Sequence, residues 1–159
     1  MGADGGFRRF YEEQYEAVFR AVFLLCRDRE VAEDATQDAF VRALERWRRL
    51  GDASWAGGWV TTTALNRARR LLRRRPADPT ALAPVGEQEA AIDLWRAVAA
   101  LPLRHQQAVV LHYRLGLSTA ETAAAMGCGD GTLRAYLTRA RRSLERALTE
   151  EADGTRPDR

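Results

Sequence analysis

Residues 101–144 read LPLRHQQAVVLHYRLGLSTAETAAAMGCGDGTLRAYLTRARRSL, and this stretch predicts a helix-turn-helix. Ser118 and Glu121 have the spacing of a capping box, so a helix is predicted to start there. Gly127 stands where the end of that helix needs a left-handed residue. A second helix is predicted to begin near Asp130.

The predicted second helix is rich in arginine and has a clear apolar stripe. Leu133 and Leu137 are expected to hold it against the first helix, where the small Ala123 allows a close crossing. A short helix, a glycine turn and a basic helix suit insertion into the major groove of DNA. The alternative is a surface helical hairpin with solvated arginines, which the spacing of cap, turn glycine and leucines disfavours.

Composition sets the broad class of the chain. Its 159 residues fit one or two small domains, and 46% are apolar, so a core can form. The formal net charge is only +3, and all 25 basic residues are arginine. The charge is segregated: residues 28–38 hold five acids and one base, whereas residues 65–75 hold six arginines and no acid. This separation suggests two different partners.

The two cysteines, Cys26 and Cys128, are far apart in the sequence. Their number and spacing argue against a disulfide framework or a structural zinc site, and both are expected to be small buried apolar residues. The sequence has no apolar signal core and no run long enough to span a bilayer. We therefore expect a cytoplasmic protein.

Signals for enzymatic chemistry are weak. The sequence contains no HExxH, P-loop, GxGxxG or nucleophile-elbow motif. His105 and His112 lie seven positions apart, with no nearby cysteine or carboxylate cluster to complete a metal site. We expect no catalytic residue, no cofactor and no bound metal.

Helical periodicity extends through most of the chain and predicts an all-α fold. The helices expected before the helix-turn-helix cover 7–26, 29–49, 55–75, 89–100 and 102–115. Asp28 is expected to cap the second of these. Three of the five prolines fall in 76–90, which is therefore predicted to be a flexible linker. The predicted organisation is a helical domain at 1–75, the linker at 76–90, a second helical domain at 91–149 and a polar tail at 150–159.

The helix over 59–75, WVTTTALNRARRLLRRR, is a second candidate for binding nucleic acid. Its arginines could follow phosphates, and nearby tryptophans could stack on unpaired bases. The alternative places the tryptophans in the core and the arginines on a solvated face. The helix over 29–49 carries acidic and amide side chains on its outer face. From these residues alone an ordinary solvated face is favoured there over a protein-docking face.

Together these segments resemble an extracytoplasmic-function (ECF) sigma factor, group IV of the sigma-70 family, over about 7–147. DREVAEDATQDAFVRALERW (28–47) resembles the region that docks on core RNA polymerase. WVTTTALNRARRLLRRR (59–75) resembles the helix that melts the promoter and reads the −10 element, and 101–144 resembles the −35 reader. The short segment at 48–59 resembles an actinobacterial, SigE-like subgroup.

The resemblance implies three sets of site residues. The −35 set is Thr132, Leu133, Arg134, Ala135, Tyr136, Thr138, Arg139, Arg141 and Arg142. The −10 set is Trp55, Trp59, Thr62, Asn66, Arg67, Arg70, Arg73 and Arg74. The polymerase set is Glu33, Asp34, Gln37, Asp38 and Arg42, which would contact the clamp of the largest polymerase subunits.

The chain departs from the family pattern in places. Gly129 stands where a serine commonly caps the recognition helix, and Arg134, Ala135 and Tyr136 replace Lys-Ser-Arg, which suggests an altered −35 preference. Arg70 adds charge at a commonly acidic position.

The function implied is that of a non-enzymatic initiation factor that binds core polymerase, reads −35 duplex and −10 non-template strand, and helps to melt the promoter. The implied partners are core polymerase, promoter DNA and an anti-sigma factor, with no membrane contact by the chain itself. The chain is expected to be a monomer, free or bound to the anti-sigma factor. Two alternatives stay open. One is a stand-alone regulator that dimerises and binds duplex DNA without polymerase, and the other is a helical interaction protein without salt-sensitive DNA binding.

Overall fold

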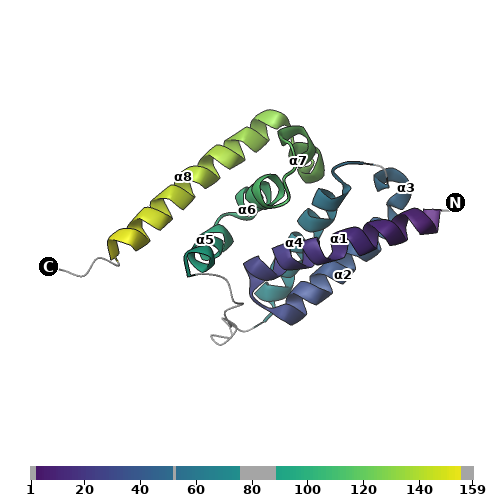
Figure 1. The fold of residues 1–159 in the computed structure, drawn as a ribbon, viewed down its shortest axis with the longest axis horizontal. Coiled ribbons are helices and arrows are strands. Elements are labelled where there is room, and N and C mark those ends of the chain that lie inside the picture. Colours follow the sequence, from purple (N-terminus) through teal and green to yellow (C-terminus); the bar gives the residue numbers. More distant parts are fainter. Residues whose placement is uncertain (1–2, 52, 76–88, 155–159) are drawn as a thin grey trace.

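A computed structural model describes residues 3–51, 53–75 and 89–154, and within these segments the chain is helical with no strand (Figure 1). This confirms the predicted all-α class. The elements in chain order are α1 (Ala3–Cys26), α2 (Arg29–Glu45), α3 (Trp47–Leu50), α4 (Ala56–Arg73), α5 (Glu89–Ala99), α6 (Leu103–Val109), the π-helix η1 (Val110–Arg114), α7 (Thr119–Met126) and α8 (Asp130–Gly154). Most of the predicted linker, 76–88, and the end of the predicted tail, 155–159, lie outside the described residues.

The N-terminal module consists of α1, α2, α3 and α4. Its buried core consists mainly of alanine and valine side chains around Phe40 of α2, which is only 2% exposed, and partly buried aromatic rings pack against it. The Asp28 side chain accepts a hydrogen bond from the backbone N–H of Val31 at 3.0 Å, which confirms the predicted cap of α2. The single helix predicted over 29–49 is wrong in one respect, because it is interrupted at Arg46. After the interruption, Trp47 packs edge-on against Phe7, with ring centroids 5.3 Å apart.

The C-terminal module consists of α5 to α8, and its helix-turn-helix has the predicted local geometry. Glu121 donates its backbone N–H to the Ser118 hydroxyl at 3.1 Å, and the Glu121 carboxylate accepts from the Ser118 N–H at 2.9 Å. Gly127 ends α7 with φ +64°, and α8 begins at Asp130. The capping box and the left-handed turn are therefore confirmed.

A π-helical turn follows α6 and was not predicted. It covers Val110–Arg114, and the Leu115 N–H donates to the Val110 carbonyl at 3.0 Å, which is the i to i+5 pattern. Gly116, with φ +70°, then turns the chain toward α7. The His112 ring nitrogen Nδ1 is 2.8 Å from the Leu117 carbonyl oxygen, so this histidine fixes the turn rather than facing a ligand.

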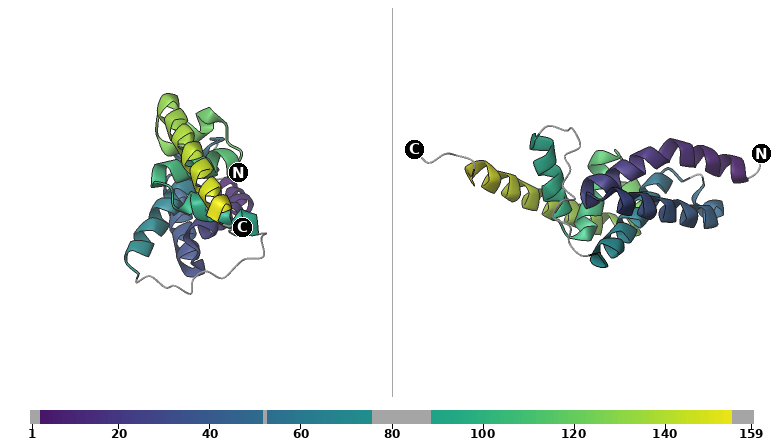
Figure 2. Two further views of the ribbon diagram at one scale, coloured as in Figure 1. Left: turned by 90° about the vertical axis from the view of Figure 1, so that its left-hand side faces the viewer. Right: turned by 90° about the horizontal axis from the view of Figure 1, so that it is seen from below.

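The two modules pack directly against each other, with α4 beside α7 and α1 beside α5 (Figures 1 and 2). Ala21 of α1 is 0% exposed because it joins a buried cluster with Val98, Leu101 and Ala140 of the C-terminal module. The start of α1 and the end of α8 lie at opposite ends of the molecule. Among the described helices, none combines the length and apolar character required to cross a bilayer.

Candidate nucleic-acid interface

The −35 set lies along the first half of α8. Leu133, Leu137 and Ala140 recur at helical spacing and form its buried stripe. The exposed members of the set are Thr132, Arg134, Thr138, Arg139, Arg141 and Arg142, while Ala135 and Tyr136 are half-buried. Leu133 is 0% exposed, so it must be corrected to a residue that supports α8 from behind and does not face DNA.

Tyr136 is held by the neighbouring helix α6. Its ring lies 5.4 Å from the His105 ring, and the Arg104 guanidinium carbon is 5.8 Å from its centroid. Arg104 also donates to the Met126 carbonyl at 2.8 Å, at the end of α7. These contacts link α6 to the end of α7 and to α8, so Tyr136 is packed at the edge of the exposed, arginine-bearing side of α8.

His105 has a depressed basicity in this setting. Burial, and secondarily the positive charge of Arg139, lowers the pKa of His105 below its ordinary value. Its Nδ1 atom is buried and has no hydrogen-bond partner among the described residues. The neutral ring therefore fits the packing against Tyr136, and a proton here would add a charge beside Arg139.

A second basic surface is a pocket of about 160 Å³ between α2 and α4. It brings together four members of the −10 set: Trp59, Asn66, Arg67 and Arg70. Its other lining residues are Arg42, which was assigned to the polymerase set, and Arg46 and Thr63, which were assigned to neither set. The Arg46 guanidinium carbon lies 5.8 Å from the centroid of the Trp59 ring. Four guanidinium groups, an indole and an amide in one pocket suit a phosphate and an unpaired base.

The rest of the −10 set is not gathered in this pocket. Trp55 packs against the core of the C-terminal module. Thr62 is 7% exposed, and its hydroxyl finds no hydrogen-bond partner within the described segments. Arg73 and Arg74 are exposed at the end of α4. Together with the exposed Arg69 of the same helix, these two arginines can extend the basic surface beyond the pocket.

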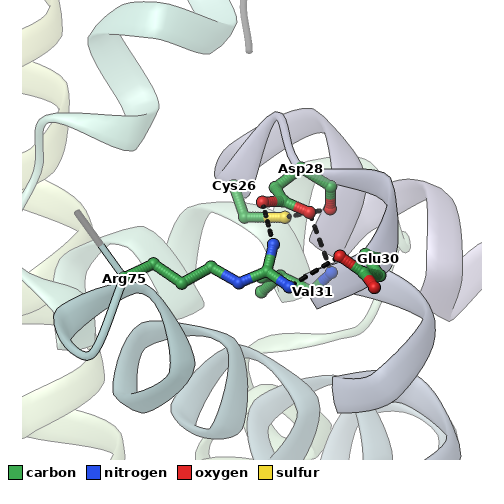
Figure 3. Close-up of polar contacts among 5 residues, drawn as sticks. All are labelled: Cys26, Asp28, Glu30, Val31 and Arg75. Carbon is green, nitrogen blue, oxygen red and sulfur yellow. Dashed lines mark hydrogen bonds and ion pairs between the residues drawn. The ribbon is translucent and has the colours of Figure 1, made fainter. Parts of the chain in front are cut away.

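The last arginine of the run, Arg75, is neutralised by acids of the N-terminal module (Figure 3). Its guanidinium lies 2.8 Å from the Asp28 carboxylate and 2.6 Å from the Glu30 carboxylate. Both hydrogen bonds raise the pKa of Arg75, with Glu30 contributing most. Arg75 therefore holds the end of α4 to the start of α2, and its charge is already paired with two carboxylates.

Cys26 lies beside the ion pairs of Arg75, and Figure 3 shows its thiol next to Asp28. The thiol donates to the Asp28 carbonyl at 3.3 Å, and burial raises the pKa of Cys26 to about 11. The adjacent Arg27 has φ +55°, a left-handed conformation that lets the chain reverse between α1 and α2. Cys26 is therefore a poorly acidic thiol, and both Cys26 and Cys128 are half-buried, not fully buried as predicted.

The polymerase set spreads over three sides of α2. Asp34 and Gln37 are exposed on its outer face. Glu33 lies on one flank, where it accepts a hydrogen bond from Arg29 at 2.9 Å. Asp38 lies on the other flank and pairs with Arg67 of α4 at 2.6 Å.

The same outer face carries two exposed apolar residues that were not among the predicted site residues, and the inward position expected for Leu44 from helical periodicity is wrong. Val41 is 57% exposed and Leu44 is 49% exposed, although both side chains are apolar. Val41 follows Asp34 by seven positions and Asp38 by three, so it lies on the stripe of the polar side chains. In the sequence, an apolar residue in the middle of this polar stripe could have indicated a contact surface.

Comparison with protein families matches both modules. Residues 10–76 match sigma-70 region 2, and residues 91–144 match sigma-70 region 4. The pocket and the acidic face belong to the first match, and the helix-turn-helix belongs to the second.

Individual relatives agree with these matches. The chain is 31% identical to the ECF RNA polymerase sigma factor SigM of Mycobacterium tuberculosis over 89% of this chain and 76% of that protein. It is 30% identical to the ECF RNA polymerase sigma factor BldN of Streptomyces coelicolor over 95% of this chain and 63% of that protein, so it spans less than two thirds of BldN. In fold it is similar to the sigma factor RpoE solved with the anti-sigma factor NepR from Bartonella quintana, with a TM-score of 0.71, 22% identity, and coverage of 90% of this chain and 96% of that one.

Proposed function

The chain belongs to the ECF sigma factors of the sigma-70 family, and from this membership we propose that it directs promoter-specific initiation by core RNA polymerase. In this role it is a non-enzymatic factor that supplies binding surfaces and no chemistry. The N-terminal module would dock on polymerase and capture the −10 strand, and the C-terminal module would hold the −35 duplex. The observation that carries the proposal is the α2–α4 pocket, which places four arginines beside Trp59 and Asn66 next to the acidic face of α2.

The −35 contact is proposed for the outward side of α8. Ala135, Thr138 and Arg142 follow one another at helical spacing on the side opposite the buried leucines. Arg134 and Arg141 lie on a neighbouring stripe, from which a guanidinium can reach base edges or phosphates. Insertion of the first turns of α8 into the major groove would place Arg134 and Thr138 nearest to bases, and the later arginines nearest to phosphates.

The −10 contact is proposed for the α2–α4 pocket. Unpairing promoter DNA costs a few kcal/mol per extruded base, and stacking on an aromatic ring returns about 1–3 kcal/mol per base. Trp59 supplies the ring, and Asn66 supplies an amide that can bond to a base edge. Arg42, Arg46 and Arg70 supply positive charge for the phosphates. Within the described segments, neither Arg42 nor Arg70 takes part in an ion pair, so their charge is available.

The polymerase contact is proposed for the outer face of α2. Asp34 and Gln37 on this face, and Asp38 on its flank, would supply polar contacts, and Val41 and Leu44 would supply the apolar centre that stable interfaces need. An anti-sigma factor that covers this face would block polymerase docking. We propose such a regulator because a relative of the same fold, RpoE, was solved with one. The site of action would be the cytoplasm, where a bacterium keeps its polymerase and chromosome.

Run-off transcription with purified core polymerase on a promoter library tests this function. The chain should confer start-site choice that core polymerase alone lacks, and the variant Arg134→Ala should change the selected −35 sequences. A chain that joins polymerase without selecting start sites, or fails to join it, contradicts the proposal. Dimerisation with tight duplex binding in the absence of polymerase would support a stand-alone regulator instead.

A further inference from the structure

Arg104 of α6 lies where three helices of the C-terminal module meet. Its Nη2 donates to the Met126 carbonyl at the end of α7, at 2.8 Å, and its Nη1 donates to the Gln107 side-chain oxygen at 3.1 Å. Gln107 is 0% exposed, so its amide is a well-ordered partner. The guanidinium carbon of Arg104 is 5.8 Å from the centroid of the Tyr136 ring in α8. One half-buried side chain therefore contacts both helices of the helix-turn-helix from a third helix.

The bond to Met126 caps the end of α7. The last four carbonyls of a helix have no partner within that helix. The turn that follows α7 satisfies the Ala123 carbonyl, which accepts from the backbone N–H of Cys128 at 3.0 Å. The Met126 carbonyl accepts from Arg104 instead, and a positive charge is favourable at the C-terminal end of a helix. Arg104 thus holds the point from which the chain turns toward α8.

The turn itself determines the direction of α8 only weakly. Residues 127–129 connect α7 to α8, and two of these three are glycine, which permits a wide range of backbone conformations. Leu133 and Leu137 bury α8 against α7, but apolar burial is not directional. The contacts of Arg104 are directional, because its guanidinium is planar and its donors have fixed positions.

Tyr136 connects these contacts to the exposed side of α8. It lies two positions after Arg134 and two before Thr138, both of which are exposed. The His105 ring of α6 also packs against Tyr136, with centroids 5.4 Å apart. A rotation of α8 about its own axis would move Tyr136 away from both partners on α6. The same rotation would turn Arg134 and Thr138 through an equal angle.

We propose that Arg104 is a positioning residue for −35 recognition, which orients α8 so that its exposed side chains meet base edges, and that Arg104 itself does not contact DNA. This inference rests on the proposed −35 contact, which it supports from a different helix. Base readout needs side chains held within about 0.5 Å of the productive geometry, whereas phosphate contacts carry no sequence information. Loss of Arg104 should therefore reduce discrimination between sequences more than overall affinity for DNA.

Two substitutions of Arg104 and a matched control test this role. Arg104→Met keeps an unbranched side chain but removes every donor. Arg104→Lys keeps the charge at the end of α7, but a point charge cannot replace the planar contacts with α7 and α8. The control is Arg114→Met, because the guanidinium carbon of Arg114 lies 5.6 Å from the Trp95 ring of α5 in the same module. It removes the same kind of cation–ring contact without touching Tyr136.

The measurement uses each chain assembled with core polymerase. The wild type first selects −35 sequences from a promoter library, and anisotropy then compares one selected promoter with the same promoter carrying a scrambled −35 segment. The ratio of the two affinities should fall about tenfold in both Arg104 variants, the loss expected for one good base contact. It should stay at the wild-type value in Arg114→Met. A ratio cancels any uniform effect on assembly with polymerase.

The salt dependence separates positioning from direct contact. The slope of log affinity against log salt should be unchanged in Arg104→Met, because no phosphate contact is lost. A slope smaller by about 1, with equal losses on both promoters, would make Arg104 a phosphate contact and overturn the inference. In a Tyr136→Ala background, Arg104→Lys should cause no further loss, because the ring that Arg104 orients is gone. Losses that multiply would contradict the proposed link.

Circular dichroism checks the fold of each variant. If Arg104→Met does not fold, Arg104→Lys, which keeps the charge at the end of α7, decides the outcome. A selective wild type together with equally selective Arg104 variants rejects the positioning role alone. A wild-type complex that selects no −35 sequence rejects the proposed function, and the inference falls with it.

Discussion

Arg67 of α4 and Asp38 of α2 form an ion pair, with Nε and Oδ2 2.6 Å apart. The pair joins a residue of the −10 set to a residue of the polymerase set. The two proposed surfaces are therefore contiguous, and occupation of one changes the charge presented by the other. A polymerase group that bonds to Asp38 would release Arg67 toward the α2–α4 pocket, which Arg67 also lines.

The first prediction concerns this pair. Asp38→Asn should weaken co-purification with core polymerase, and should strengthen binding of the free chain to single-stranded DNA because Arg67 loses its carboxylate. Both side chains are partly exposed, so the free energy of unfolding should change by less than about 1 kcal/mol. Asp34→Asn, on the exposed face, is the control that should weaken polymerase binding without the gain for DNA. If the two variants bind polymerase and single-stranded DNA equally, the ion pair does not couple Arg67 to the polymerase-docking face.

The second prediction concerns the charge of the pocket. Arg42→Ala should reduce single-strand binding and promoter melting while leaving co-purification with polymerase unchanged, because Arg42 lines the pocket with Trp59 and Arg70. Potassium permanganate footprinting and pull-down assays measure the two effects. Arg48→Ala removes an exposed arginine outside the pocket lining and should change melting less. If Arg42→Ala instead loses polymerase binding, Arg42 contacts polymerase, as the sequence predicted.

The third prediction concerns phosphate contacts of α8. Arg142→Ala should weaken duplex binding by a similar factor for all sequences, and the slope of log affinity against log salt should become smaller by about 1. Arg20→Ala removes an exposed arginine of α1, paired with Glu16, and should leave the slope unchanged. An effect of Arg142→Ala confined to particular promoter sequences would identify it as a reader of bases.

The fourth prediction separates support from contact in α8. Leu133→Ala should lower the free energy of unfolding by about 2–5 kcal/mol, because the side chain is fully buried and its removal leaves a cavity. Urea denaturation followed by circular dichroism measures this loss. Leu148→Ala, at a site 36% exposed on the same helix, should have a much smaller effect. Normal stability together with lost DNA binding in Leu133→Ala would restore Leu133 as a DNA contact.

The fifth prediction concerns pH. The pKa of His105 is held below its ordinary value by burial and by Arg139. As pH falls below about 6.5, the unfolded chain takes up a proton at this residue before the folded chain does, so stability is lost until pH passes the folded pKa. Urea midpoints between pH 8 and pH 5 should therefore fall less steeply for His105→Gln than for the wild type. Parallel curves would show that His105 does not contribute to acid sensitivity.

Local features could be predicted from the sequence because they depend on near neighbours. The Asp28 cap, the Ser118–Glu121 capping box and the Gly127 turn each involve residues within four positions, and all three are confirmed. The π-helical turn at Val110–Arg114 left no such signal, because its residues also suit an ordinary α-helix.

The candidate site was predictable in composition but not in arrangement. The arginines and Trp59 were identifiable by their type and spacing. The bond between Asn66 and Gln107 joins residues 41 positions apart, and it depends on how two modules pack, which helical periodicity does not encode. For the same reason Trp55 was predicted to face DNA, although it packs against the C-terminal module. The assignments of single residues to polymerase and DNA remain predictions.

The ion pairs of Arg75 with Asp28 and Glu30 determine where a chimaera of two sigma factors should be joined. A chimaera joined after Arg75 keeps the positive charge that balances the acidic start of α2. A junction one residue earlier removes Arg75, and with it the ion pairs that hold the end of α4 to the start of α2. A C-terminal module from another sigma factor should therefore be joined after Arg75, so that the ion pairs of Arg75 with Asp28 and Glu30 are kept.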